Sequence, residues 1–123
     1  RFMSMFQIFN ELTENKIKII TVNVNGIRAA ERKGFFDWLE KEDADLVCLQ
    51  EIRAQVKDIE NHKFWPKPYF CFYFPAEKKG YSGVGILSKF KPKHVIQGLN
   101  SKEFDYEGRY LELVFNNFSI ASV

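Results

Sequence analysis

The chain has 123 residues, of which 46% are hydrophobic, 28% are charged and 16% are aromatic, and its formal net charge is only +2. This composition excludes a disordered chain, a collagen-like repeat and a low-complexity linker, and the length corresponds to one domain. No apolar run approaches the ~20 residues of a transmembrane helix, so we expect no membrane association. Both cysteines, Cys48 and Cys71, lie in apolar runs. They predict buried free thiols in a cytoplasmic protein rather than a disulfide scaffold.

The first half of the chain predicts a β-α-β unit. The β-branched run 17–22 favours a buried strand, and the Asn-Val-Asn-Gly segment that follows favours a loop at the end of that strand. Residues 1–15 precede it as an N-terminal extension. Whether all of it is native to the protein stays open, and a short helix is one option for it. The later elements are expected to be a helix over 34–41, a second buried strand over 45–50 and a polar helical stretch over 54–62.

The second half predicts short strands in an antiparallel meander. An Asn116-Asn117 pair favours a hairpin turn between the last two strands. Together the two halves indicate an α/β fold, in which about seven strands in a mixed sheet are backed by helices on one side and the other face is left uncovered. The chain is therefore expected to be incomplete at its C-terminus. The expected strands span 69–74, 83–88, 93–97, 110–115 and 118–123.

Oxygen-bearing side chains follow the two predicted parallel strands. Asn23 and Asn25 come after the first strand, and Glu51 comes after the second. Neighbouring parallel strands end at the same sheet edge, where ligands of α/β proteins bind, and such a donor set suits Mg²⁺. The alternative is that the two asparagines are turn residues and the glutamate is an exposed strand end.

A glycine-rich segment, Gly-Tyr-Ser-Gly-Val-Gly at 80–85, follows Lys78 and Lys79. Between Arg53 and Lys93 the chain carries nine basic and three acidic residues. Glycines allow backbone amides to approach a phosphate closely, so this region is a candidate contact for a phosphate backbone. The alternatives are an ordinary turn before a strand and lysines that face only solvent. The acidic segment 103–109 reads, by itself, as a solvated loop.

Five segments, taken together, resemble the exonuclease III family of DNA-repair nucleases, most closely its bacterial members. They occur in the order and approximate spacing of that family, and the resemblance covers Lys16 to Val123. The segments are TVNVNGIRAA (21–30), GFFDWL (34–39), CLQE (48–51), GYSGVG (80–85) and EFDYEGR (103–109).

The resemblance implies a fold and a reaction. Residues 16–123 would be the N-terminal half of an endonuclease/exonuclease/phosphatase domain, and hence half of a four-layered α/β sandwich. The full-length protein would be a monomer. It would hydrolyse phosphodiester bonds of double-stranded DNA with Mg²⁺ or Mn²⁺, either 5′ to an abasic site or at a 3′ end. The implied residues are Asn23 and Glu51 for catalysis, Glu51, Asn23 and Asn25 for metal, Arg28, Ala29, Lys33, Gly80 and Tyr81 for DNA, and Arg53, Glu107 and Arg109 as supports of the site.

The sequence departs from the family at two kinds of position. Val22 replaces an aromatic residue of the first motif, and Arg53 stands where the family often has Lys. The family's later motifs, a Tyr, an Asp-x-Asn pair and an Asp-His pair, fall beyond Val123, so these 123 residues alone are expected to be inactive. Two other functions stay open: a phosphatase or phospholipid esterase of the same superfamily, and a non-catalytic DNA-binding fragment.

Overall fold

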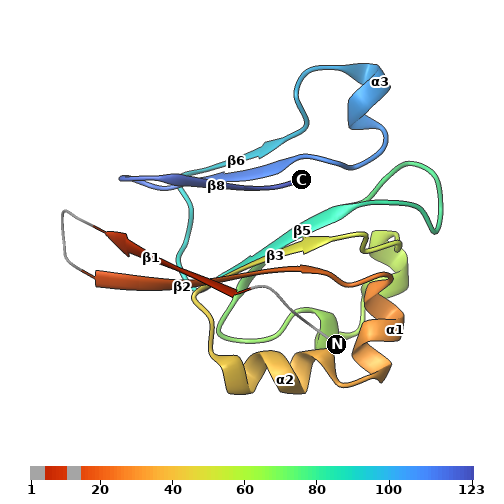
Figure 1. Cartoon of the computed structure of the whole chain (residues 1–123). Helices are drawn as coiled ribbons and strands as arrows, with labels where there is room; N and C mark the ends of the chain where they lie inside the picture. Colours follow the sequence, from red (N-terminus) through yellow and green to blue (C-terminus); the bar gives the residue numbers. More distant parts are fainter. Residues whose placement is uncertain (1–4, 11–14) are drawn as a thin grey trace.

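The computed structural model describes residues 5–10 and 15–123. A five-stranded sheet forms the centre, with helices on one side and a three-stranded sheet on the other (Figure 1). The α/β class with helices on one side of a mixed sheet is therefore confirmed. The expectation of a single sheet with an uncovered face is wrong, because the last three strands fold over the first sheet instead of extending it.

The five-stranded sheet runs in the order β1-β2-β3-β5-β4. Only β2 and β3 are parallel, and the other neighbours are antiparallel. The first strand replaces the short helix considered for the N-terminal extension. The strands are β1 (Met5–Asn10), β2 (Asn15–Asn23), β3 (Leu46–Gln50), β4 (Phe70–Phe74) and β5 (Val84–Ser88).

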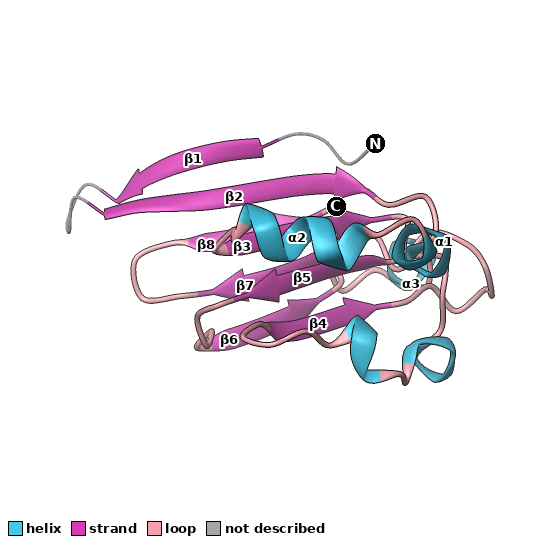
Figure 2. Cartoon of the chain, turned by 90° about the horizontal axis from the view of Figure 1, so that it is seen from below, coloured by secondary structure: helices cyan, strands magenta, loops and turns pink. Residues whose placement is uncertain are grey.

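Two helices cover one face of this sheet. The expected helix is α2 (Phe35–Glu42), which begins after Gly34 in a left-handed conformation and buries Phe35 and Leu39. Figure 2 shows α2 lying over the middle of the five-stranded sheet. The sequence patterns did not predict α1 (Ile27–Arg32), which follows β2 directly.

The helical stretch expected over 54–62 is wrong in extent. Only two short 3₁₀ turns form there, η1 (Val56–Ile59) and η2 (His62–Phe64). The Asp58 carboxylate accepts from Gln55 N at 2.9 Å, and Asn61 Oδ1 accepts from Lys63 N at 2.9 Å. These side chains satisfy the backbone locally and so compete with a continuous helix.

The second sheet has the order β6-β7-β8 and contains the predicted hairpin at Asn116 and Asn117. Its strands are β6 (His94–Gln97), β7 (Leu111–Val114) and β8 (Ser119–Ser122), with α3 (Lys102–Asp105) between the first two. The helix α3 lies in the segment expected to be a solvated loop.

Alternation along the central strands supplies both faces of the first sheet. Ile20 and Val47 point to the helices, where they pack with Phe35 and Leu39. Cys48, Val84 and Ile86 point to the second sheet, where they pack with Leu111 and Leu113. The strands are buried on both sides, which explains their nearly continuous apolar sequences. Cys48 is buried as expected, whereas Cys71 is only partly buried. Within residues 5–10 and 15–123, no helix has the length and apolar character that crossing a membrane requires.

Candidate metal and phosphate site

The parallel strands β2 and β3 bring Asn23 and Glu51 together. Asn23 is in register with Gln50, and Val24 N donates to Gln50 O at 3.0 Å, so the two strands end side by side. From there Asn23 Nδ2 donates to Glu51 Oε2 at 2.5 Å. The expected meeting of these two side chains at one sheet edge is confirmed.

Asn25 contributes to the site through its backbone. Its N–H donates to Asn23 Oδ1 at 2.9 Å, and its φ of 49° places it in the left-handed region that asparagine tolerates. This contact orients the Asn23 side chain, because the oxygen accepts from Asn25 while the nitrogen donates to Glu51. Asn25 is therefore a turn residue, and it also lies next to Asn23 as expected.

The loop that carries Glu51 is held by two other segments. Glu51 and Arg53 both have positive φ, at 52° and 50°, and the buried Ile52 lies between them. Gly26 N donates to Glu51 O at 2.8 Å, and Arg53 N donates to Ser82 O at 2.8 Å. The start of α1 and the glycine-rich segment thus fix the position from which the carboxylate projects.

Donors surround the Glu51 carboxylate. Arg53 Nη2 lies 2.6 Å from Glu51 Oε1, while Asn23 binds the other oxygen. The hydrogen bond from Asn23 lowers the Glu51 pKa from its ordinary 4.5, and so do the hydrogen bond and charge of Arg53 and the charge of Arg109. The side chain is 37% exposed, so the carboxylate is ionised at neutral pH and open to solvent.

The donor set fits a hard divalent cation. Glu51 supplies a carboxylate, which suits Mg²⁺, and Asn23 positions it, because the amide nitrogen faces Glu51 while the amide oxygen accepts from Asn25 N. In the part of the chain that the structure describes, no three His, Cys, Asp or Glu side chains gather in a group that could hold a metal ion. A site with one carboxylate, its remaining positions left for water and substrate, matches Mg²⁺ or Mn²⁺ and does not match a protein-enclosed Zn²⁺.

An arginine-lined pocket of about 320 Å³ includes Arg53, the residue that is paired with this carboxylate. Three of the predicted DNA contacts, Arg28, Ala29 and Gly80, line it together with Arg53. Arg32 also lines it and was not predicted, although its spacing of four residues from Arg28 would have indicated it once α1 was recognised. Lys33, at the C-terminal end of α1, is exposed but is not one of the lining residues.

Tyr81 lies between cationic groups. Arg109 Nη2 donates to the Tyr81 hydroxyl at 3.0 Å, and the Lys78 Nζ lies 5.4 Å from the ring centroid. Glu107 forms an ion pair with the Arg109 Nε, and its hydrogen bond raises the Arg109 pKa. Arg109 thus supports Tyr81 directly, and Glu107 supports it through Arg109. The charge of Arg109 also acts on Glu51.

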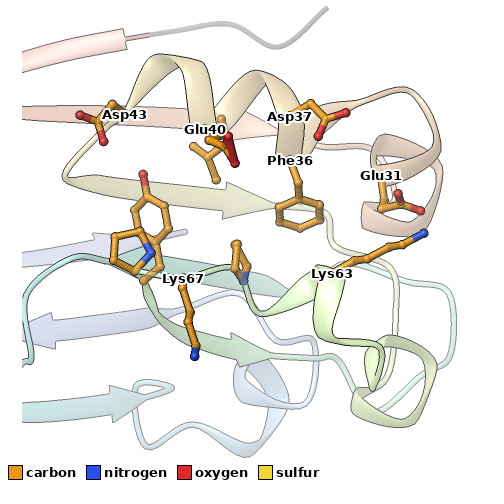
Figure 3. Close-up of a pocket in the computed structure, with 11 residues that line it drawn as sticks. Glu31, Phe36, Asp37, Glu40, Asp43, Lys63 and Lys67 are labelled. Carbon is orange, nitrogen blue, oxygen red and sulfur yellow. The ribbon is translucent and has the colours of Figure 1, made fainter.

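A second pocket, of about 400 Å³, lies on the helical side of the molecule (Figure 3). Asp37 and Glu40 border it from α2, Asp43 borders it from the position that follows this helix, and Lys63 and Lys67 border it from the segment before β4. None of the site residues predicted from the sequence lines this pocket. The larger cavity is therefore separate from the candidate site.

Comparison with known proteins finds a matching family and relatives that are named as nucleases. The profile of the Endonuclease/Exonuclease/phosphatase family matches residues 20–123. An exodeoxyribonuclease from Bacillus subtilis (strain 168) is 42% identical over 87% of the chain, and a DNA-(apurinic or apyrimidinic site) endonuclease from Dictyostelium discoideum is 36% identical over 91% of it.

A solved structure of an AP endonuclease from Archaeoglobus fulgidus superimposes with a TM-score of 0.73 and 28% identity, over 85% of this chain and 39% of that one. The chain spans 42% of the Bacillus relative and 31% of the Dictyostelium relative. The resemblance of its motifs to exonuclease III nucleases is thereby confirmed. This chain belongs to the Endonuclease/Exonuclease/phosphatase family.

Proposed function

We propose that the chain is the N-terminal half of a Mg²⁺-dependent nuclease that hydrolyses phosphodiester bonds in duplex DNA, 5′ to an abasic site or at a 3′ end. The observation that carries this proposal is the hydrogen bond of Asn23 to Glu51 beside a pocket lined by Arg28, Arg32 and Arg53. An oxygen donor set for a cation next to a cationic pocket is what an anionic phosphodiester requires. The names of the Bacillus and Dictyostelium relatives support the same activity.

Each group has a distinct task in this proposal. Glu51 would hold the divalent cation, with its carboxylate positioned by Asn23, and the bound cation would neutralise phosphate charge and stabilise the leaving oxygen. Arg28 and Arg53 bind phosphate oxygens, and their guanidinium groups suit bidentate contacts. The partly exposed ring of Tyr81 packs against the nucleic acid.

The reaction also needs two proton transfers, to which none of these residues is assigned. A base has to accept a proton from the attacking water, and the leaving oxygen has to receive one. The resemblance assigns these steps to motifs that follow this stretch of sequence in the family. We therefore propose that the 123 residues alone bind DNA but do not cleave it.

A substrate comparison tests the proposal. The whole protein is incubated with an abasic-site duplex, a recessed 3′-end duplex, an inositol phosphate and phospholipid vesicles, after EDTA treatment and with or without added Mg²⁺ or Mn²⁺. We expect cleavage of one or both DNA duplexes only with added cation. Hydrolysis of the inositol phosphate or the lipid in preference to DNA would overturn the nuclease assignment, and DNA cleavage unaffected by EDTA would overturn the metal requirement.

The isolated chain provides the companion test. In a DNA-binding assay it should bind the abasic-site duplex, and in the cleavage assay it should leave that duplex intact at every cation concentration. Cation-dependent cleavage by the 123-residue chain would show that its own residues suffice for the reaction, contrary to the proposal.

A further inference from the structure

Arg53 belongs to two sites at once. Its Nη2 contacts Glu51 Oε1 at 2.6 Å, and the residue is also one of those that line the arginine pocket, with Arg28 and Arg32. The guanidinium that holds the Glu51 carboxylate therefore belongs to a residue at the border of a pocket that basic side chains make suitable for an anion. A phosphate bound in that pocket would compete with the Glu51 carboxylate for this guanidinium.

The backbone of Arg53 is fixed, whereas its side chain is accessible. Arg53 N donates to Ser82 O at 2.8 Å, and Arg53 O accepts from Arg28 Nη2 at 3.1 Å. The side chains of Arg53 and Glu51 are 45% and 37% exposed, respectively. An ion pair between groups so open to solvent is weak, so a second anion can draw the guanidinium away at little cost.

Glu51 would keep one of its two hydrogen bonds if the guanidinium left. Its Oε2 keeps the hydrogen bond from Asn23 Nδ2, which holds the side chain in position. Its Oε1 loses the Arg53 donor and the positive charge nearest to it. A free carboxylate oxygen with less positive charge beside it is a better ligand for a divalent cation.

We propose that Arg53 couples phosphate binding to cation binding. Without DNA, Arg53 holds Glu51 Oε1, and a phosphodiester in the arginine pocket transfers the guanidinium to the phosphate and frees that oxygen for the cation. This inference rests on the proposed nuclease function and makes Arg53 a positioning residue that acts through Glu51.

The coupling has a size and a direction. By linkage, DNA raises the affinity for the cation by the same factor by which the cation raises the affinity for DNA. The strength of an exposed ion pair sets the part due to Arg53, which corresponds to roughly a two- to fivefold change in the dissociation constant. The cation is then held more tightly on DNA than in free solution.

Titration with Mn²⁺, followed by electron paramagnetic resonance, tests this coupling in the whole protein. Free Mn²⁺ is measured with and without a saturating phosphorothioate duplex, which resists cleavage. For Arg53→Gln we expect Mn²⁺ to bind roughly two- to fivefold more tightly than to the wild type in the absence of DNA, and we expect DNA to add less affinity than it does in the wild type.

Arg32→Gln is the matched control, because Arg32 lines the same pocket from α1. It should require more DNA for saturation but keep the full gain in Mn²⁺ affinity once DNA is saturating. Arg53→Lys keeps the positive charge but lacks the planar guanidinium, so its Mn²⁺ affinity without DNA should lie between those of the wild type and Arg53→Gln. It serves as the second variant if Arg53→Gln does not fold.

The results separate two kinds of failure. Weaker Mn²⁺ binding by Arg53→Gln without DNA, or an undiminished gain on adding DNA, would overturn the coupling while leaving the cation site intact. Wild-type protein that binds no Mn²⁺ with or without DNA would overturn the cation site and the proposed function with it.

Discussion

Asn23 Nδ2 donates a 2.5 Å hydrogen bond to Glu51 Oε2, although 28 positions separate the two residues in the sequence. The parallel pairing of β2 with β3 makes this contact possible, because both strands end at the same edge of the sheet. The contact holds an ionised carboxylate beside three arginines that line a pocket. The parallel pairing of β2 with β3 thus brings together the two residues, Asn23 and Glu51, at the centre of the candidate site.

The Asn23 contact predicts a pH effect. Hydrogen bonding from Asn23, assisted by Arg53, lowers the Glu51 pKa below 4.5, so the folded state keeps this carboxylate charged at lower pH than the unfolded chain does. The resulting stabilisation is complete above the unfolded pKa and is lost as the pH falls through the folded value. Asn23→Ala should raise the Glu51 pKa toward 4.5 in a carboxyl-carbon NMR titration. Gln97→Ala, at an exposed position of β6, is the control and should leave the Glu51 titration curve as in the wild type. If Asn23→Ala gives the same curve as this control, the hydrogen bond from Asn23 does not lower the Glu51 pKa.

Gly83 predicts a stability effect at the base of the site. A Cβ there would lie 2.6 Å from Ile52 Cγ1, and the residue has a φ of +88°. Gly83→Ala should therefore lower the free energy of unfolding by about 1–3 kcal/mol through backbone strain, with overpacking against Ile52 adding about as much again. Gly80→Ala, with a φ of +67° and no atom within 4 Å of the added Cβ, should cost only about 1–2 kcal/mol. Equal losses in urea unfolding would show that Ile52 moves aside freely.

Arg28 predicts a change in the salt dependence of DNA binding. It lines the arginine pocket, so Arg28→Gln should weaken binding to duplex DNA and reduce the slope of log K against log salt by about 0.9, the value for one lost phosphate contact. Lys63→Gln removes a charge from the pocket on the helical side and should leave the slope unchanged. If both variants give the wild-type slope in fluorescence anisotropy titrations, Arg28 does not contact phosphate.

Leu113 tests the packing of the two sheets. It is fully buried in the cluster that joins β7 to Cys48, Val84 and Ile86. Leu113→Ala should lower the free energy of unfolding by about 2–5 kcal/mol, because it leaves a cavity between the sheets. Leu99→Ala, at a position that is 55% exposed, should change it by less than about 0.5 kcal/mol. A similar small effect of both substitutions would be inconsistent with the observed sheet packing.

Local sequence patterns predicted much of the fold. Four strands of the central sheet, β2 to β5, follow from β-branched, apolar and aromatic runs, and α2 follows from the spacing of Phe35 and Leu39. The strand β1 was not predicted. The meeting of Asn23 with Glu51 also followed, because parallel neighbours in a β-α-β unit end at one edge. In these cases the local pattern and the tertiary structure agree.

The remaining features depend on contacts that are distant in sequence. Helix α1 is only six residues long and is held by hydrogen bonds such as that of Ile27 N to Ile52 O at 2.9 Å. The alternation of apolar and other side chains in β7 would be the same if this strand extended the first sheet or if it packed over that sheet, so the pattern does not distinguish the two arrangements. The contact of Arg109 with Tyr81 joins residues 28 positions apart, and the separate patterns of the two segments contain no sign of it. Arg32 was missed for the related reason that α1 was not recognised.

Cation binding by a Glu51 variant tests the central claim most directly. Mn²⁺ affinity is measured by calorimetry in the whole protein for the wild type, Glu51→Gln and the exposed control Glu60→Gln, with circular dichroism to confirm folding. We predict that Glu51→Gln weakens binding at least about tenfold, as expected when the one carboxylate of the described donor set loses its charge, while Glu60→Gln binds as the wild type does. Equal Mn²⁺ affinity in all three folded proteins would contradict the assignment of this sheet edge as the cation site.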